Sequence, residues 1–175
     1  MAQADTVHTD PATAWLPPLA DEVTFRDGLA KLASGVAIVA CWADGQPRGL
    51  LVSSLTGLST QPPRILFCVR KAAAAHAALL AAEAVGVSLL DKDDLEEAQR
   101  FAAADRARER FGDSGWRLDP TRPPERRDAL AAFSGPVRCR LDGGTHTIFI
   151  LDVARADARD ADPLLYFERG FRKLA

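Results

Sequence analysis

The sequence predicts a mainly β domain, an antiparallel barrel with helices on its rim. Its 175 residues suit one domain with a sizeable core. Apolar and β-branched runs outnumber the helical patterns, and most successive runs are joined by connections that carry hairpin signals. Strands joined by hairpins pair antiparallel, which favours a barrel over a doubly wound parallel sheet.

The N-terminal segment differs in composition from the rest of the chain. Residues 1–24 mix Thr, Ala, Asp and Pro around Trp15, and Pro17 and Pro18 oppose a helix there. We therefore expect an N-terminal arm, flexible or draped over the surface, ahead of one domain that spans residues 25–175.

A short helix is expected to open the domain. Phe25, Leu29 and Leu32 fall at helical spacing. Thr24 is placed to cap the start of this helix, and Gly35 is placed to close its end.

Paired strands are expected after this helix. VAIVACWA (36–43) and RGLLVSSL (48–55) are apolar and β-branched, and Asp44-Gly45 between them is a strong hairpin signal. RILFCVRK (64–71) follows two prolines and ends in charged residues, which indicates a further strand.

Two helices and another strand are expected in the middle of the chain. Residues 72–84 contain nine alanines, the best helix former, and VGVSLLD (85–91) is again apolar and β-branched. Residues 91–111 begin with acids and end with arginines, which complements a helix macrodipole. We expect the Arg-rich run 100–110 to form a solvated face of this second helix.

The C-terminal part is expected to return to strands. SGPVRCRLDGG (134–144) and THTIFILDVARAD (145–157) predict a second hairpin around Gly143-Gly144. PLLYFERGFRKL (163–174) predicts a final short strand.

Composition and charge exclude several classes of protein. The formal net charge of −2 and the pI near 5.9 give no positive field that would attract nucleic acid or an anionic membrane. No apolar stretch is long enough to span a bilayer, and the N-terminus lacks the pattern of a secretory signal, so we expect a cytoplasmic protein. Cys41, Cys68 and Cys139 form no CxxC pair and are expected to be reduced thiols.

Few sequence motifs for chemistry are present. GxGxxG, the P-loop and GxSxG are all missing, and His8, His76 and His146 lack the spacing of metal ligands, so no metal site is expected. Small and hydroxyl residues in strands remain, with Arg70-Lys71 at the end of one strand and His146 at the start of another. Such a set could receive a planar cofactor and hold its phosphate at a strand end.

Four segments in order resemble the short-chain flavin reductases, the small components of two-component flavin monooxygenases. They are FRDGLAKLASGVAIVAC (25–41), RGLLVSSLTGLSTQPPRILFCVRK (48–71), GGTHTIFILDV (143–153) and PLLYFERGFRKL (163–174). The resemblance implies a flavin reductase-like, FMN-binding split β-barrel with Greek-key antiparallel topology, assembled as a homodimer. It also implies non-covalent FMN or FAD, hydride transfer from NADH or NADPH to flavin N5, and delivery of reduced flavin to a partner monooxygenase.

The resemblance also implies roles for single residues. Ser53 and Ser54 would follow the flavin ring and its ribityl chain, the strand end at Arg70 would approach the phosphate, and His146 would be the catalytic residue beside the nicotinamide. Phe101 would be an aromatic cover. The implied cofactor-binding residues are Leu51, Val52, Ser53, Ser54, Ser59, Pro62, Cys68, Val69, Arg70, Lys71, Phe101, Phe171 and Arg172.

The chain departs from the family pattern around this implied site. Ala72, Ala74 and Ala75 stand where the family commonly has Ser and Thr after the basic residue, so hydroxyl donors to a phosphate are missing. Leu51 replaces a frequent Thr, and Thr145 replaces the Asp that precedes the histidine. These changes predict loose flavin binding.

Three functions are compatible with loose binding. A reductase that uses flavin as a diffusing substrate tolerates it, because product release is part of the reaction cycle. A repurposed member of the family would instead bind or transform another small molecule, such as a biosynthetic intermediate, without net redox chemistry. A non-catalytic subunit would bind an oxygenase or another protein through residues 1–24 and Trp15.

Overall fold

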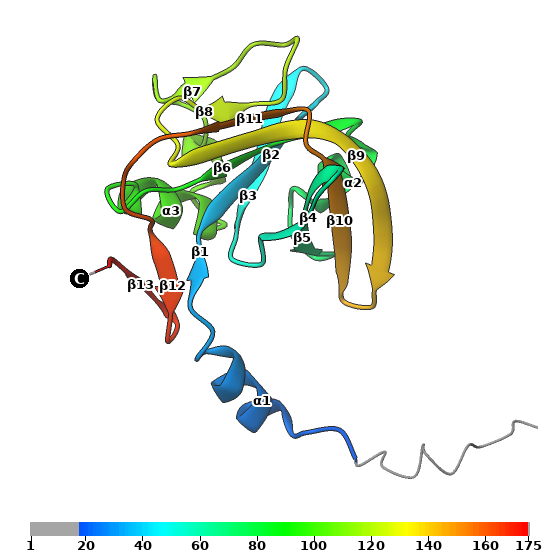
Figure 1. Cartoon of the computed structure of the whole chain (residues 1–175), viewed down its shortest axis with the longest axis vertical. Coiled ribbons are helices and arrows are strands. Elements are labelled where there is room, and N and C mark those ends of the chain that lie inside the picture. Colours follow the sequence, from blue (N-terminus) through cyan, green and yellow to red (C-terminus); the bar gives the residue numbers. More distant parts are fainter. Residues whose placement is uncertain (1–17, 175) are drawn as a thin grey trace, which may run out of the picture.

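The computed structural model describes residues 18–174 and has the expected fold class, an antiparallel barrel with helices at its margins (Figure 1). Residues 1–17 of the expected arm lie outside the described part. The helices are α1 (Glu22–Leu29), α2 (His76–Ala81), α3 (Leu95–Ala102) and the 3-10 turn η2 (Ala107–Glu109). The strands are β1 (Ser34–Gly35), β2 (Ala37–Ala43), β3 (Gln46–Val52), β4 (Thr56–Thr60), β5 (Pro63–Arg70), β6 (Ala84–Leu89), β7 (Trp116–Arg117), β8 (Glu125–Arg126), β9 (Ala131–Gly143), β10 (His146–Asp152), β11 (Arg155–Ala158), β12 (Leu165–Phe167) and β13 (Gly170–Arg172).

One antiparallel sheet forms the barrel wall. Its strand order is β3-β2-β6-β9-β10-β5-β4, and β11 joins through β9. The long strand β9 belongs to both halves, since its first residues pair with β6 and its last with β10. A register shift between Ile150 and Leu151 marks the place where the pairing changes. Such irregularities bend a strand and let a sheet close on itself.

Two hairpins appear where their turn residues predict them. β2 and β3 are joined by Asp44 and Gly45, both of which have positive φ (52° and 72°). Consecutive left-handed residues make the turn that matches the twist of paired strands. β9 and β10 are joined through Gly144, which has a φ of 75°.

Two hydrophobic clusters hold the fold together. The first lies inside the barrel, where Phe67 and Phe149 stack from β5 and β10 with ring centroids 5.3 Å apart. The second lies beneath α3 and includes Phe101, Trp116 and Leu164. Residues of β5 alternate between buried and half-exposed, because successive side chains of a strand point to opposite faces.

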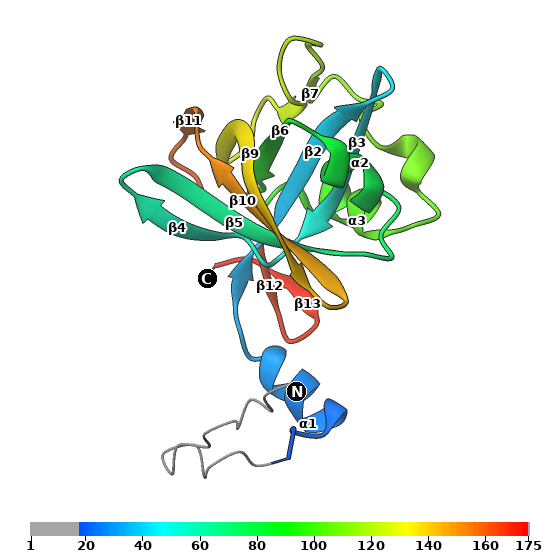
Figure 2. The ribbon, with the colours of Figure 1, turned by 90° about the vertical axis from the view of Figure 1, so that its right-hand side faces the viewer.

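The first helix starts earlier than the sequence predicts. Asp21 caps α1 by accepting a hydrogen bond from the Thr24 N–H at 2.9 Å, so Thr24 lies inside the helix instead of capping it. The helix ends at Leu29, and Gly35 lies in β1 rather than at a helix end. Figures 1 and 2 show α1 projecting away from the barrel, beyond β1 and the β12–β13 hairpin.

The prediction of one helix over residues 91–111 is wrong. The chain forms α3, leaves helical geometry at Ala103 and makes the short turn η2. Arg110 folds back and donates to the carbonyls of Arg100 and Ala103 at 3.3 and 2.7 Å, which satisfies the open end of α3. The arginines therefore do not form a solvated helix face. The alanine-rich helix is also shorter than expected, with only His76–Ala81 helical within residues 72–84.

The C-terminal strand is also a hairpin rather than a single strand. Glu168 and Arg169 have positive φ (49° and 60°) and reverse the chain between β12 and β13. No helix in the described part of the chain is long and apolar enough to cross a membrane.

Candidate functional site

Two adjoining cavities lie between the end of β3, the start of β10, helix α1 and the β12–β13 hairpin. Their volumes are about 790 and 480 Å³, and both are lined by Ser53, Tyr166 and Arg169. We call the pair the Ser53 hollow. Cavities of a few hundred cubic ångströms with mostly apolar walls and a few polar groups are typical of small-molecule sites.

The hollow gathers residues that are distant in the sequence. It brings together six residues that the sequence analysis assigned to the site, from three separate segments. These residues are Leu51, Val52, Ser53, Ser54, His146 and Phe171.

The two serines that follow β3 differ in their hydrogen bonding. Ser54 Oγ accepts from the Cys68 N–H at 2.9 Å and donates to the Cys68 carbonyl at 3.2 Å, so its hydroxyl joins the end of β3 to β5. Ser53 is exposed, lines both cavities and makes no side-chain hydrogen bond among residues 18–174. Ser53 is therefore the serine whose hydroxyl is available to a ligand.

His146 is positioned by its neighbours in the sheet and in the chain. The antiparallel register of β5 and β10 places Arg70 directly opposite His146. The Thr145 hydroxyl lies 2.9 Å from His146 Nδ1, which is hydrogen-bonding distance. Thr145 can therefore fix the ring orientation, and the ring lines the larger cavity.

The two basic residues at the end of β5, Arg70 and Lys71, differ in their ion pairs. The Lys71 ammonium pairs with Asp142 at 2.7 Å, and this hydrogen bond holds the pKa of the Asp142 carboxyl below its usual range. Arg70 is exposed and forms no ion pair within the described residues. Lys71 is thus already neutralised by a carboxylate, whereas the Arg70 guanidinium is free to meet an anion.

The alanine-rich loop has unpaired backbone donors. The N–H groups of Lys71, Ala73 and His76 donate to carbonyls of the chain at about 3 Å. The N–H groups of Ala72, Ala74 and Ala75 have no acceptor in the described part of the chain. Backbone amides are therefore present where the side-chain hydroxyls are missing.

Several other predicted site residues lie away from the hollow. Ser59 and Pro62 are at the far end of β5 from Arg70, and the Ser59 hydroxyl donates to the Pro62 carbonyl. Val69 is fully buried inside the barrel, and Cys68 is half-buried. Arg172 is exposed and donates to the carbonyl of its neighbour at 2.9 Å. Within one chain, none of these residues lines the hollow, and Cys68 is linked to it only through its backbone hydrogen bonds with Ser54.

Phe101 occupies a core position. Its side chain is 2% exposed, and its ring lies 5.0 Å from Phe111 and 5.4 Å from Trp116, measured between centroids. The Arg110 guanidinium lies 5.3 Å above the same ring. The fold thus uses Phe101 to seal α3 against the barrel, and this position gives no support to the expected covering role.

Charged contacts attach α1 to the β12–β13 turn. Lys31 pairs with Glu168 and Arg169 pairs with Asp27, while the Glu168 N–H donates to the Ala30 carbonyl at 2.9 Å. The ion pair with Lys31 lowers the pKa of Glu168. These contacts hold the two elements that form one wall of the hollow.

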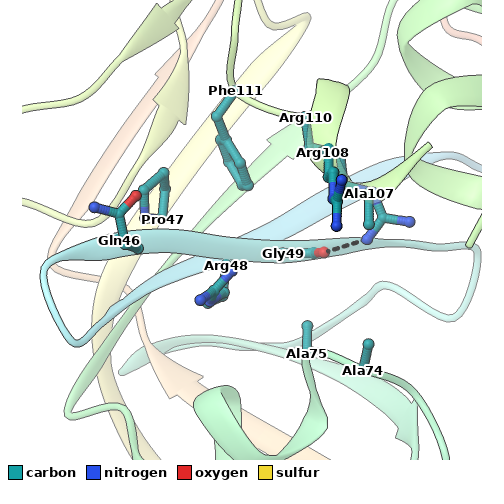
Figure 3. Close-up of a pocket in the computed structure, with 10 residues that line it drawn as sticks. All are labelled: Gln46, Pro47, Arg48, Gly49, Ala74, Ala75, Ala107, Arg108, Arg110 and Phe111. Carbon is teal, nitrogen blue, oxygen red and sulfur yellow. Dashed lines mark hydrogen bonds between the residues drawn. The ribbon is translucent and has the colours of Figure 1, made fainter. Parts of the chain in front are cut away.

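Another pocket lies along the edge of β3, and Ala74 and Ala75 of the alanine-rich loop form part of its wall (Figure 3). We call it the β3-edge pocket. Its volume is about 420 Å³, and it is lined by Gln46, Pro47, Arg48, Gly49, Ala74, Ala75, Ala107, Arg108, Arg110 and Phe111. Burial lowers the pKa of the Arg110 guanidinium, which donates to the Gly49 carbonyl at 3.1 Å.

The sequence did not predict all residues of the Ser53 hollow or of the β3-edge pocket. The sequence analysis did not include Ser34, Tyr166 and Arg169 in the hollow, and it interpreted Arg108 as part of a solvated helix. Reading Glu168-Arg169 as a turn would have placed Tyr166 and Arg169 together. Residues 18–174 contain no cluster of three or more side chains able to hold a metal ion.

Comparison with known proteins gives a consistent result. The flavin reductase like domain family matches residues 29–175. The reductase component of a 4-nitrophenol 4-monooxygenase/4-nitrocatechol 2-monooxygenase from Rhodococcus opacus is 34% identical, over 89% of this chain and 82% of that protein. The FMN reductase (NADH) RutF of Methylorubrum extorquens is 32% identical, over 88% of this chain and 76% of that protein.

Solved structures share the same fold. The NADH:FAD oxidoreductase SgcE6 of Streptomyces globisporus C-1027, in complex with NAD and FAD fragments, superposes with a TM-score of 0.81. It is 29% identical, over 89% of this chain and 93% of that chain.

Proposed function

Because the chain belongs to the flavin reductase-like family, we propose that it is a flavin reductase that uses NADH or NADPH to reduce FMN or FAD. The observation that carries this proposal is the Ser53 hollow, which combines a free hydroxyl, a positioned imidazole and apolar walls in one cavity. Relatives named as FMN reductases (NADH) and as a monooxygenase reductase component support the same activity.

The residues of the hollow fit a bound flavin. Leu51, Val52 and Phe171 offer apolar contact to a planar ring, and Ser53 offers a hydroxyl to its polar edge. The chemistry that flavin supplies there is acceptance of hydride at N5. The protein has to hold both cofactors in contact and exclude competing reactions, so few acidic or basic side chains are needed.

His146 and Arg70 have separate roles in this proposal. His146, held by Thr145, lines the larger cavity and orients the nicotinamide against the flavin. Arg70 lies opposite it on β5, and its guanidinium, which has no ion pair among the described residues, offsets the negative charge of the flavin phosphate. Both roles are electrostatic and positional and require no proton transfer.

We also propose a homodimer that works with a partner monooxygenase in the cytoplasm. The name of the Rhodococcus relative supports an oxygenase partner, which reduced flavin would reach by diffusion. Helix α1 buries none of its residues in the single chain, and Val23 and Phe25 are 69% and 58% exposed. An apolar helix face left open by one chain supports contact with a second copy.

The test combines flavin binding with nicotinamide oxidation. Purified protein is titrated with FMN and FAD, and consumption of NADH and NADPH is then followed with each flavin. We expect turnover above roughly 1 s⁻¹, a low value for an enzyme on its own substrate. Ser53→Ala and His146→Ala should each reduce it at least about tenfold.

Ser114→Ala is the matched control, because Ser114 is exposed, precedes β7 and lines neither cavity of the hollow. It should leave flavin binding and turnover unchanged. Absence of flavin binding at high micromolar concentration, together with no nicotinamide oxidation, would overturn the proposal. That result would favour a barrel that has been repurposed for another small molecule, which the loss of hydroxyls at Ala72, Ala74 and Ala75 is consistent with.

A further inference from the structure

The α1 side of the Ser53 hollow carries paired charges. Both arginines that line the larger cavity lie next to a carboxylate of α1. Arg169 Nη2 lies 2.5 Å from Asp27 Oδ1, and Arg26 Nη1 lies 3.5 Å from Glu22 Oε1. A guanidinium that is already paired attracts a second anion weakly, and the carboxylate beside it repels that anion. This side of the cavity is therefore suited to a ligand with few negative charges.

The turn between β12 and β13 fixes where Arg169 lies. Glu168 and Arg169 both have positive φ (49° and 60°), a conformation that residues other than glycine seldom adopt. The Glu168 N–H donates to the Ala30 carbonyl at 2.9 Å and joins this turn to the end of α1. Residues held in such a conformation cluster at functional sites. Arg169, which lines both cavities of the hollow, is thus held where the two cavities meet.

The same side of the larger cavity has apolar surface for the adenosine part of a dinucleotide. The proposed function places the flavin ring in the smaller cavity and the nicotinamide beside His146. Leu29 and Leu32 also line the larger cavity, and they are 47% and 64% exposed. Apolar side chains of this kind are typical of the walls that contact a ligand ring. A dinucleotide with its nicotinamide beside His146 can therefore extend its adenosine end toward α1, near Asp27 and Arg169.

The adenosine end is where NADPH differs from NADH. NADPH carries one further phosphate on the 2′ oxygen of the ribose, with close to two negative charges at neutral pH. Dinucleotide-binding folds commonly place a carboxylate near this ribose to accept NADH, and an arginine there to accommodate the phosphate of NADPH. In this chain the carboxylate and the arginine stand side by side, and the carboxylate neutralises the arginine.

We propose that the Asp27–Arg169 ion pair makes this protein select NADH over NADPH. This inference rests on the proposed flavin reductase function. Asp27 repels the 2′-phosphate and occupies the guanidinium that would otherwise bind it. The side chains of Asp27 and Arg169 are 62% and 56% exposed, so water and salt weaken the effect. We therefore expect a preference for NADH of about tenfold.

The experiment compares the wild type with Asp27→Asn and with the double variant Asp27→Asn/Arg169→Ala. Steady-state rates are measured with NADH and NADPH at saturating FMN. Isothermal titration calorimetry with NAD⁺ and NADP⁺, in the absence of flavin, gives dissociation constants that do not depend on turnover. We expect Asp27→Asn to raise kcat/KM for NADPH and to tighten NADP⁺ binding about tenfold, with the values for NADH and NAD⁺ changed less than about threefold. Removing Arg169 as well should cancel this gain, and a gain cannot result from a misfolded variant.

Asp162→Asn is the matched control, because Asp162 is exposed, forms the same kind of ion pair with Lys92 and lines neither cavity of the hollow. Its ratio of NADPH to NADH activity should equal that of the wild type. A wild type that uses both nicotinamides equally well, or an Asp27 variant with an unchanged ratio, would overturn the inference while leaving flavin reduction intact. A gain that persists without Arg169 would also overturn it. A wild type that oxidises neither nicotinamide and binds neither NAD⁺ nor NADP⁺ would contradict the proposed function, and this inference with it.

Discussion

Replacing Phe101 with alanine should destabilise the protein without changing its affinity for flavin. The ring is 2% exposed, packs against Phe111 and Trp116, and lies beneath the Arg110 guanidinium. Removing a buried phenylalanine costs about 3–5 kcal/mol. For a domain of this size, that loss corresponds to a decrease in melting temperature of about 6–20 °C.

Urea unfolding, monitored by far-UV circular dichroism, gives the change in the free energy of unfolding. Quenching of flavin fluorescence gives the dissociation constant of flavin from the folded protein. Phe171→Ala is the comparison, because Phe171 is half-buried and lines the Ser53 hollow. We expect Phe101→Ala to alter the flavin dissociation constant less than about twofold, and Phe171→Ala to weaken binding more than it lowers stability.

A Phe101 variant that unfolds like the wild type but binds flavin at least about tenfold more weakly would show that this ring contacts the cofactor and does not serve the core. Phe101→Leu provides the same test if the alanine variant does not fold. It keeps most of the apolar volume, so its loss of stability should be smaller.

Further predictions concern buried and closely packed groups. Burial raises the pKa of the Cys41 thiol from 9.0 to about 11, so the unfolded chain loses this proton first. The free energy of unfolding, measured with urea, should therefore fall by about 2 kcal/mol as pH rises from 9 to 11. Ser54→Ala removes the hydroxyl that bonds both backbone groups of Cys68, and thermal unfolding should report a loss of about 1 kcal/mol. Gly135→Ala would place a Cβ atom 1.9 Å from the Asp152 carbonyl oxygen. We expect a loss of at least about 3 kcal/mol or failure to accumulate as soluble protein.

The predictions for Cys41 and Gly135 each have a control. Cys41→Ala should remove the alkaline decrease in stability while leaving contributions from other groups unchanged, and an identical decrease in both proteins would contradict the assignment. Gly28→Ala is the partner of the Gly135 variant, because nothing lies within 4 Å of the added Cβ. It should be neutral or slightly stabilising.

The local signals in the sequence were sufficient to predict most strands of the sheet. Alternating apolar residues predict β5, and Asp44-Gly45 predicts the β2–β3 turn, because both signals act through near neighbours. The helical boundaries were less predictable. α3 ends where Arg110 reaches back to its carbonyls, and that contact depends on the fold of the following segment.

Local sequence patterns were enough to predict the antiparallel strands and their tight turns, and the family resemblance is confirmed by the match over residues 29–175. It also identified Ser53 and His146, which the tertiary structure then brought to one cavity. Tertiary contacts placed Phe101 in the core and brought the edge of β3 and the segment after α3 to one pocket, and local patterns carry no information about either. Burial and the pairing of charges depend on which distant segments meet, and those contacts form only when the barrel closes.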